Sequence, residues 1–239
     1  AKIRKPAVAG SFYAGDAKEL RQDVQNCFSR CKNPLMENVQ AVIVPHAGYV
    51  FSGVTAASAF AAINPDAEYE HIFLLGPSHH VYLGKASVNT GASAYATPLG
   101  NVPVDTALCK DLMEKSDAIT YAPEAHESEH CLEVELPFLQ YHMKKIPSIV
   151  PIIIATQELT TLKKIADTLK PYLNEKNLFV ISSDFSHYPA YKDAEIVDGL
   201  TKDSIMTGKV EAFMNATLHN QELGIDHLAT SACGMAPIA

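Results

Sequence analysis

Four short apolar runs stand out along the chain, and each ends abruptly at polar or turn-forming residues. They cover residues 41–45, 71–76, 149–155 and 177–181. An uninterrupted apolar run of this length is typical of a strand buried on both faces, as in a parallel sheet. The pattern therefore predicts four strands at the centre of a mostly parallel sheet.

Segments with helix signals lie between these runs. Asp16, followed three residues later by Glu19, resembles a capping box at the start of a first helix. Further helices are predicted at 54–63, after Asp105, over 132–143 with Pro137 disturbing its middle, and at 160–173, 191–206 and 209–218. Short edge strands and turns are predicted for 82–104. Because strands alternate with helices, we expect an α/β fold with helices on both faces of the sheet, in one domain spanning 1–239.

Composition narrows the class of protein and its partners. The chain has 239 residues, 47% of them hydrophobic, which suits one α/β domain. Its net charge of −8 without a basic run argues against nucleic acid or an anionic membrane as the main partner. No apolar stretch approaches the ~20 residues of a membrane span, and the N-terminus lacks the apolar core of a signal peptide. Five cysteines without a disulfide-like spacing indicate a reducing, cytoplasmic setting.

Histidines follow three of the predicted strands at the point where each strand ends. His46 follows the first run, the adjacent His79 and His80 follow the second, and Asp184 and His187 follow the fourth. If these strands are parallel neighbours, all three turns open on one edge of the sheet, where ligands bind in α/β folds. Taken singly, each histidine is more typical of a surface or capping residue. Taken together, they predict a metal site.

Cys233 is the second candidate for chemistry. It lies in a loop, residues 230–234, that is predicted to run into a helix. A cysteine near a helix N-terminus has a lowered pKa, which favours the thiolate as a ligand or nucleophile. The alternative is a small buried apolar residue, which is how most free cysteines behave.

The most polar part of the chain, residues 126–135, reads HESEHCLEVE. His126 and His130 are four residues apart and would share one face of a helix, as in two-histidine metal sites. The H-E-x-x-H order of zinc proteases is absent. We expect most of the glutamates to be solvated at a helix start, and His130, beside the apolar helix, to lie near the pocket.

Six motifs, in this order and spacing, resemble the MEMO family over nearly the whole chain: VPHAGYVFSG, LLGPSHH, ATPLG, EHCLEVELPF, ISSDFSHY and TSACG. The resemblance includes the AmmeMemoRadiSam system protein B group. The family is similar in fold to the class III extradiol (LigB-like) dioxygenases, which implies a three-layer α/β/α domain with a mononuclear non-heme metal site.

The resemblance also implies roles for individual residues. It implies that His46, His79 and Cys233 are the metal ligands, with cysteine where the dioxygenases use glutamate. It places the catalytic histidine base at His187 with Asp184 beside it, and a pocket histidine at His130. Two histidines and a thiolate make a softer site than two histidines and a carboxylate, so Fe(II) is expected, with Cu or Zn as alternatives. Family members continue for tens of residues past the end of this chain, so a C-terminal segment is expected beyond residue 239.

Three functions are compatible with these residues. The first is a metal-dependent, dioxygenase-like oxidoreductase that acts on an unknown small molecule, with His187 as acid or base. The second is a non-catalytic module that binds metal or a peptide in the same pocket, in an adaptor or redox role. The third is a hydrolase or transferase centred on Cys233, with His187 or His46 as its base.

Overall fold

A six-stranded sheet forms the middle of the protein in the computed structural model, which describes residues 2–239. Its strand order is β2-β9-β3-β8-β4-β7. The first four neighbours are β2 (Ala41–Val44), β9 (Asn177–Ser182), β3 (His71–Pro77) and β8 (Ile149–Ala155), and they run parallel. These are the four strands that the apolar runs predict, so the central parallel sheet is confirmed.

Shorter strands extend and flank this sheet. β4 (Lys85–Val88) pairs antiparallel with β8 and parallel with β7 (Ile119–Thr120). A separate three-stranded sheet has the order β1-β5-β6 and contains β1 (Lys2–Arg4), β5 (Ala92–Thr97) and β6 (Gly100–Pro103). The short edge strands predicted between residues 82 and 104 are therefore present.

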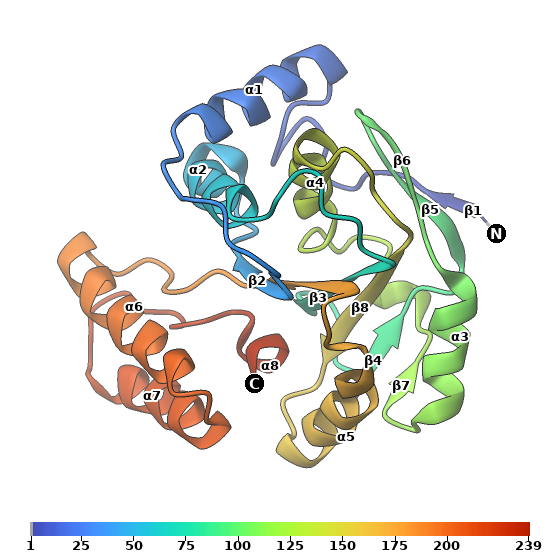
Figure 1. Cartoon of the computed structure of the whole chain (residues 1–239). Coiled ribbons are helices and arrows are strands. Elements are labelled where there is room, and N and C mark those ends of the chain that lie inside the picture. The colour runs from blue at the N-terminus through green and yellow to red at the C-terminus, as the bar shows by residue number, and fades with distance from the viewer. Residues whose placement is uncertain (1) are drawn as a thin grey trace.

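Helices cover both faces of the central sheet, as predicted. On one side lie α1 (Ala17–Ser29), α2 (Tyr49–Ala61) and α4 (Leu136–His142); across the sheet lie α5 (Leu159–Leu169), α6 (Tyr191–Met206), α7 (Val210–Glu222) and α8 (Met235–Ile238) (Figure 1). α3 (Thr106–Lys115) packs beside β7 and β8. Three 3-10 turns cover Pro123–Ala125, Glu133–Glu135 and Lys170–Tyr172. The fold is a three-layer α/β/α arrangement.

Two helices begin at the predicted N-caps, whereas a third begins earlier than predicted. The Asp16 carboxylate accepts the Glu19 N–H at 2.9 Å, and Asp105 accepts the Leu108 N–H at 2.9 Å. α2 begins at Tyr49, five residues before the predicted start, with Gly48 as its N-cap. Its first turn carries the exposed side chains of Val50 and Phe51, so the apolar stripe that marks a buried helix face begins only later in the helix.

The helix predicted over 132–143 is shorter than expected. A 3-10 turn covers Glu133–Glu135, and α4 then runs from Leu136 to His142. Pro137 therefore lies in the first helical turn instead of the middle. A proline is tolerated there because the N–H that it lacks has no partner within the helix.

The frame around the strand ends is rigid because the sheet is buried on both faces. Every residue of β8 is buried, and β3 is buried from Ile72 to Pro77. Phe60 of α2 and Phe138 of α4 pack with ring centroids 5.7 Å apart on one side of it. Within residues 2–239, no helix combines the length and apolar character needed to cross a membrane.

Candidate metal centre

Three parallel neighbours of the sheet bring the predicted site residues to one edge. β2, β9 and β3 lie side by side, with Val44 paired to Ser182 and Leu75 paired to Ile181. His46 follows β2, His79 follows β3, and Asp184 follows β9, each within two residues of the strand end. The prediction that these turns open on the same edge is confirmed.

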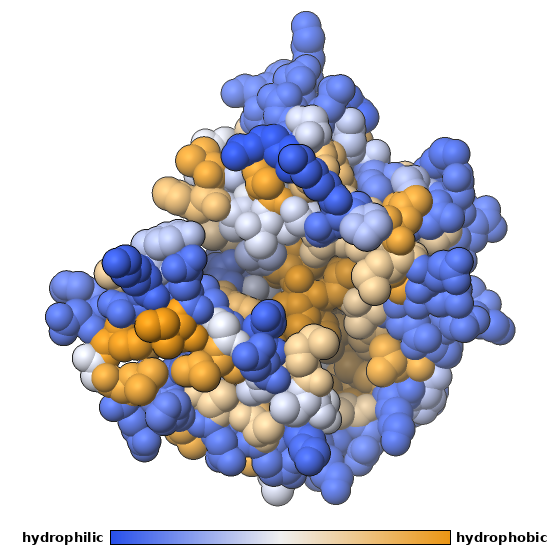
Figure 2. Space-filling model, turned by 60° about the vertical axis from the view of Figure 1, so that its left-hand side comes forward, coloured by the Kyte–Doolittle hydropathy of each residue, from blue (hydrophilic) through white to orange (hydrophobic). Residues whose placement is uncertain are grey.

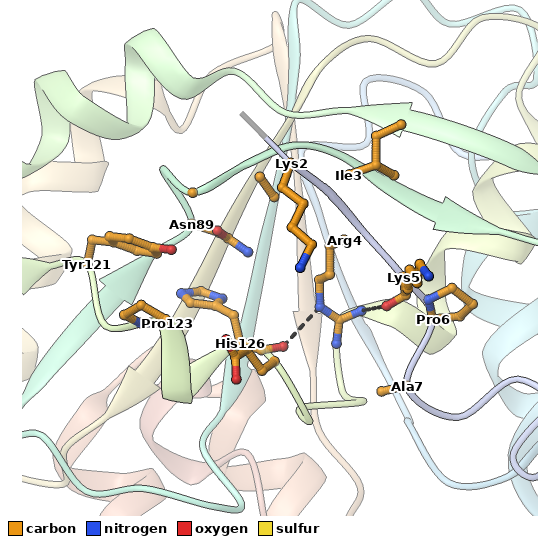
Figure 3. Close-up of a pocket in the computed structure, with 13 residues that line it drawn as sticks. Lys2, Ile3, Arg4, Lys5, Pro6, Ala7, Asn89, Tyr121, Pro123 and His126 are labelled. Carbon is orange, nitrogen blue, oxygen red and sulfur yellow. Dashed lines mark hydrogen bonds between the residues drawn. The ribbon is translucent and has the colours of Figure 1, made fainter.

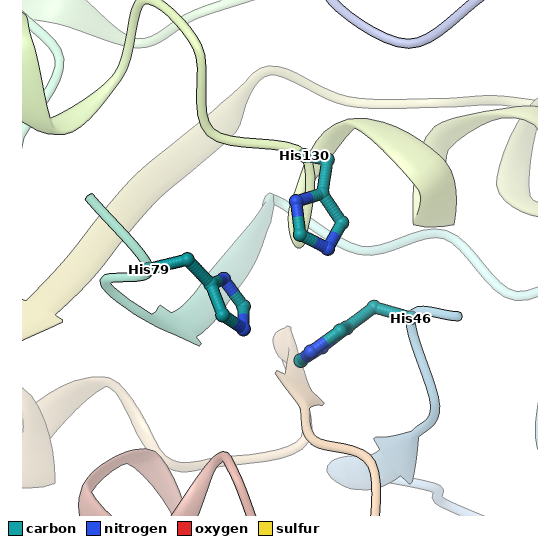
Figure 4. Close-up of side chains that lie close together, drawn as sticks. All are labelled: His46, His79 and His130. Carbon is teal, nitrogen blue, oxygen red and sulfur yellow. The ribbon is translucent and has the colours of Figure 1, made fainter. Parts of the chain in front are cut away.

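Three histidine rings meet at this edge. Figure 4 shows His46, His79 and His130 approaching one another from three separate segments. Each offers a ring nitrogen, and the three nitrogens lie within 4.8 Å of one another. The ring centroids of His79 and His130 are 4.7 Å apart and stacked, whereas His46 meets both edge-on. His130, predicted as a pocket residue, is thus part of the histidine cluster itself.

A second group shares His46 with the first. His46 Nε2, Cys233 Sγ and an Asp184 carboxylate oxygen also lie within 4.8 Å of one another, and the nitrogen–sulfur distance is 3.1 Å. Asp184 holds the turn after β2 in place, because its Oδ1 accepts the backbone N–H groups of His46 and Ala47 at 2.7 and 3.2 Å. His46 therefore links the imidazole side of the cluster to the thiol side.

The sequence left two interpretations of Cys233 open, and the structure contradicts the one with a lowered pKa. Burial raises the pKa of this thiol to about 12, and the nearby Asp184 carboxylate raises it further. The helix that follows, α8, spans only four residues and supplies little dipole. Without a metal ion, Cys233 is therefore a thiol that donates to His46 Nε2, and a free thiolate nucleophile is disfavoured. A bound metal ion deprotonates a coordinating thiol outright.

Glu129 supports His79 and was missed at the level of sequence. Its Oε2 accepts the His79 backbone N–H at 2.8 Å, and its Oε1 accepts the His79 ring Nδ1–H at 2.9 Å. Burial alone would raise the pKa of Glu129, but the hydrogen bond from His79 and the His79 charge lower it to about 2. A carboxylate on Nδ1 fixes the ring and leaves Nε2 as the ligand atom, which is how metal-binding histidines are commonly held.

Three of the four glutamates of the HESEHCLEVE run are buried and only Glu127 is exposed, so the expectation that most of them are solvated was wrong. Glu129, Glu133 and Glu135 are all buried. Glu133 pairs with Arg4 at 2.8 Å and accepts the Tyr13 hydroxyl at 2.7 Å. Their partners lie on segments far away in the sequence, which is why the local pattern resembled an exposed acidic helix start.

His126 is placed differently from the prediction as well. No helix spans residues 126–130, so His126 and His130 do not share a helix face. His126 is buried, with Nε2 2.9 Å from the Ser87 hydroxyl, and its backbone carbonyl accepts Arg4 Nε–H at 2.9 Å (Figure 3). A cavity of about 520 Å³ lies beside these residues, and its lining includes Lys2 and Tyr121 but none of the predicted site residues.

His187 lies at the edge of the centre. Its Nδ1–H donates to the Phe185 carbonyl at 2.9 Å, which leaves Nε2 free, 3.7 Å from Asp184 Oδ2. Among the described residues, it belongs to none of the sets close enough to share a metal ion. The structure therefore places His187 beside the cluster but outside the groups of candidate ligands.

Two cavities open at the site. One of about 450 Å³ is lined by His79, Cys233 and neighbouring residues of β8, and one of about 800 Å³ is lined by Asp184, His187 and Phe51. The face that bears α6 and α7 has a hollow with largely apolar walls (Figure 2). A small molecule can therefore approach the cluster from the solvent.

The donor set fits a single metal ion. A tetrahedral ion with Zn–N and Zn–S distances of about 2.0–2.3 Å keeps its ligand atoms roughly 3.3–3.8 Å apart. Within the groups His46–His79–His130 and His46–Asp184–Cys233, the donor atoms lie within 4.8 Å of one another, so small side-chain adjustments reach that spacing. His46 belongs to both groups, but among the described residues no such group holds His46, His79 and Cys233 together. Imidazole with thiolate suits zinc, copper and iron, whereas magnesium and calcium prefer oxygen ligands.

Comparison with known proteins identifies the family. The sequence model described as "Memo-like protein" matches residues 4–239. The chain belongs to the Memo-like family. This match spans both ligand groups, from His46 to Cys233, and confirms the resemblance read from the sequence motifs.

Memo-like relatives come from archaea and from yeast. A MEMO1 family protein of Methanopyrus kandleri is 33% identical over 99% of this chain and 84% of its own length. One from Aeropyrum pernix is 35% identical over the whole chain and 86% of its own length. A third, from Saccharomyces cerevisiae, is 34% identical over 78% of this chain and 60% of its own length.

Proposed function

We propose that this Memo-like protein binds one metal ion through His46, His79 and Cys233 and acts as a dioxygenase-like oxidoreductase on a small molecule. The observation that carries the proposal is the position of His46 after β2, which shares one group of close donor atoms with His79 after β3 and another with Cys233 before α8. Fe(II) is the ion that the family resemblance favours, with copper or zinc as alternatives for so soft a donor set.

The roles of the ligands follow from their hydrogen bonds. His79 presents Nε2 because Glu129 takes its Nδ1–H, and His46 presents Nε2 towards Cys233. Burial alone would lower the pKa of His79, but Glu129 raises it, so metal binding at neutral pH competes with a proton on this ring. The side chain of His79 is 30% exposed, which would leave one side of the cluster open to substrate.

Neighbouring residues would bind the substrate and move its protons. Bound iron would supply the redox chemistry. His187, with its free Nε2 facing the larger cavity, would accept a proton from a hydroxyl group of the substrate. Asp184 Oδ2, 3.7 Å away, would stabilise the imidazolium that results. His130 would orient the substrate from the opposite side of the cluster. A reducing cytoplasm would keep the Cys233 thiol available as a ligand.

A second candidate is a non-catalytic module that binds metal or a peptide. The rim of the larger cavity favours this alternative, because Phe51 and Tyr188 are 87% and 80% exposed. Exposed aromatic side chains around a hollow are typical of surfaces that hold a ligand. Such a module would show saturable ligand binding without consuming O2.

The metal content of protein purified without oxygen tests the site. We expect near-stoichiometric iron in the wild type by mass spectrometry, and its loss in His46→Ala, His79→Ala and Cys233→Ala. His219→Ala, an exposed histidine on α7, is the matched control and should keep the metal. Metal retained in all three ligand variants would overturn the proposal.

Oxygen consumption separates the two functions. With a library of catechol-like and other small substrates, the oxidoreductase should consume O2 and His187→Ala should lose that turnover while keeping its metal. Loaded wild-type protein that binds ligands but consumes no O2 with any of them would favour the binding module.

A further inference from the structure

Ser182, the last residue of β9, lies behind His46 on the side away from the cluster. Its hydroxyl oxygen is 2.7 Å from His46 Nδ1, 2.7 Å from the Cys131 carbonyl and 3.0 Å from Glu135 Oε1. All four residues are buried, so water does not compete for these hydrogen bonds. A buried polar group of this kind has to be satisfied by its protein neighbours.

The Ser182 hydroxyl has one proton, so it can donate only one of these three hydrogen bonds, and this limit fixes the direction of the other two. The Cys131 carbonyl can only accept, so at 2.7 Å it takes the Ser182 hydroxyl proton. The two remaining lone pairs of Ser182 Oγ then accept from His46 Nδ1–H and from a proton on Glu135 Oε1. With Glu135 neutral, this is the arrangement in which all three partners of Ser182 Oγ make their hydrogen bonds.

Glu135 is suited to supply that proton. Burial raises the pKa of Glu135 well above its ordinary value, and the Asp184 charge adds to the effect although the Ser182 hydrogen bond opposes it. Its Oε2 has no hydrogen-bond partner among the described residues. If Glu135 is neutral, the unpartnered Oε2 is an uncharged carbonyl oxygen. If Glu135 is ionised, Oε2 carries part of a negative charge that is buried without a partner, which costs more.

We propose that Ser182, backed by the neutral carboxyl group of Glu135, is the positioning residue that fixes His46 as the Nδ1–H tautomer and so presents the Nε2 lone pair to the metal. This inference rests on the proposed function only in taking His46 as a ligand. The tautomer itself is a property of the metal-free protein. Glu129 performs the same task for His79 through a charged carboxylate, so the two ligand histidines are held by different chemistry.

The tautomer can be measured directly in the full chain without metal. Long-range 1H–15N NMR spectra of protein labelled at histidine distinguish a protonated from an unprotonated ring nitrogen, and His46→Gln assigns the signals. We expect His46 to show a protonated Nδ1 and an unprotonated Nε2 in the wild type. A wild-type His46 with a protonated Nε2 and an unprotonated Nδ1 would overturn the proposal, and this measurement does not depend on whether the variants fold.

Variants then identify the group responsible. In a Cys233→Ala background, which removes the thiol that donates to His46 Nε2, Ser182→Ala should give a mixed or reversed His46 tautomer, and Ser182→Thr, which keeps the hydroxyl, should restore it. Glu135→Gln should behave as the wild type because an amide keeps both a donor and a carbonyl oxygen. A wild-type tautomer in Ser182→Ala in this background would overturn the role of Ser182, and a reversed tautomer in Glu135→Gln would overturn the neutral carboxyl group.

Metal affinity, measured by competition with a chelator, is the second readout. Ser182→Ala should bind Fe(II) or Zn(II) about 10–100-fold more weakly, the usual loss when a hydrogen bond behind a ligand histidine is removed. Ser87→Ala is the matched control, since it removes an equally buried serine hydroxyl 2.9 Å from a different histidine, His126. Equal losses in both variants would mark a general packing effect and overturn the positioning role. A wild type with the expected tautomer but no metal affinity would refute the proposed function and leave the tautomer assignment standing.

Discussion

Replacing Glu129 by glutamine should destabilise the protein strongly at neutral pH. The buried carboxylate accepts hydrogen bonds from the backbone N–H groups of His79, His130 and Cys131 and from the His79 ring. Glutamine must turn its NH2 group towards one of these donors, because both carboxylate oxygens are occupied as acceptors. At least one buried N–H then loses its partner.

The size of the effect follows from the pKa of Glu129, about 2 against an ordinary 4.5. Since a tenfold change in proton affinity corresponds to 1.36 kcal/mol, the ionised group contributes about 3 kcal/mol at pH 7. Its pKa is lower in the folded state than in the unfolded state. This contribution is therefore complete above pH ~4.5, and it is lost as the pH falls towards ~2.

Urea unfolding of the wild type and Glu129→Gln checks both statements. At pH 7 we expect the free energy of unfolding to differ by about 3 kcal/mol, and near pH 3 by less than half of that. Glu127→Gln, the same change at an exposed position two residues away, should have no effect beyond about 0.5 kcal/mol. A difference under 1 kcal/mol at pH 7, or one that does not shrink in acid, would refute the reasoning.

Three further substitutions probe the frame around the site by the same unfolding assay. Glu133→Gln breaks the buried pair with Arg4 and should cost roughly 3–5 kcal/mol; a cost below 1 kcal/mol would mean that the pair does not hold the segment. Gly76→Ala, next to the C-terminal end of β3, adds a methyl group that collides with the Cys131 sulfur and should cost about 1–3 kcal/mol. Gly199→Ala on α6 meets no atom within 4 Å and should stabilise by about 0.5–1 kcal/mol, so a loss there would contradict the helix.

Local sequence patterns predicted the central strands well, but they did not predict the buried hydrogen bonds that hold the candidate ligands in place. The runs that became β2, β3, β8 and β9 are apolar throughout, and burial on both faces of a sheet imposes that pattern whatever the neighbours are. Turns that carry histidine follow three of these strands, β2, β3 and β9, and they predicted that the three strand ends share one edge of the sheet. Family resemblance supplied the ligand roles, which spacing alone left open.

The partners of the buried glutamates had no such local signal. Glu133 meets Arg4 across 129 positions of sequence, and Glu135 meets Ser182 across 47. A glutamate-rich stretch looks the same whether its carboxylates face water or a distant arginine, so the sequence favoured the commoner case. The two interpretations of Cys233 stayed open for the same reason, because burial of the thiol, which raises its pKa, depends on segments that its own neighbours do not reveal.

If the proposed metal site is correct, the pairing of His46 with Cys233 bears on when a metal ion would be bound. The two residues touch but are separated by 187 positions. At a synthesis rate of about 5–20 residues per second, roughly 10–40 s pass between the addition of the histidine and that of the cysteine to the growing chain. During that interval the nascent chain exposes imidazoles that can capture ions with no sulfur ligand to select among them. Under the proposed function, correct loading would therefore follow synthesis of the whole 46–233 segment, and an ion bound earlier would have to be exchanged once Cys233 is in place.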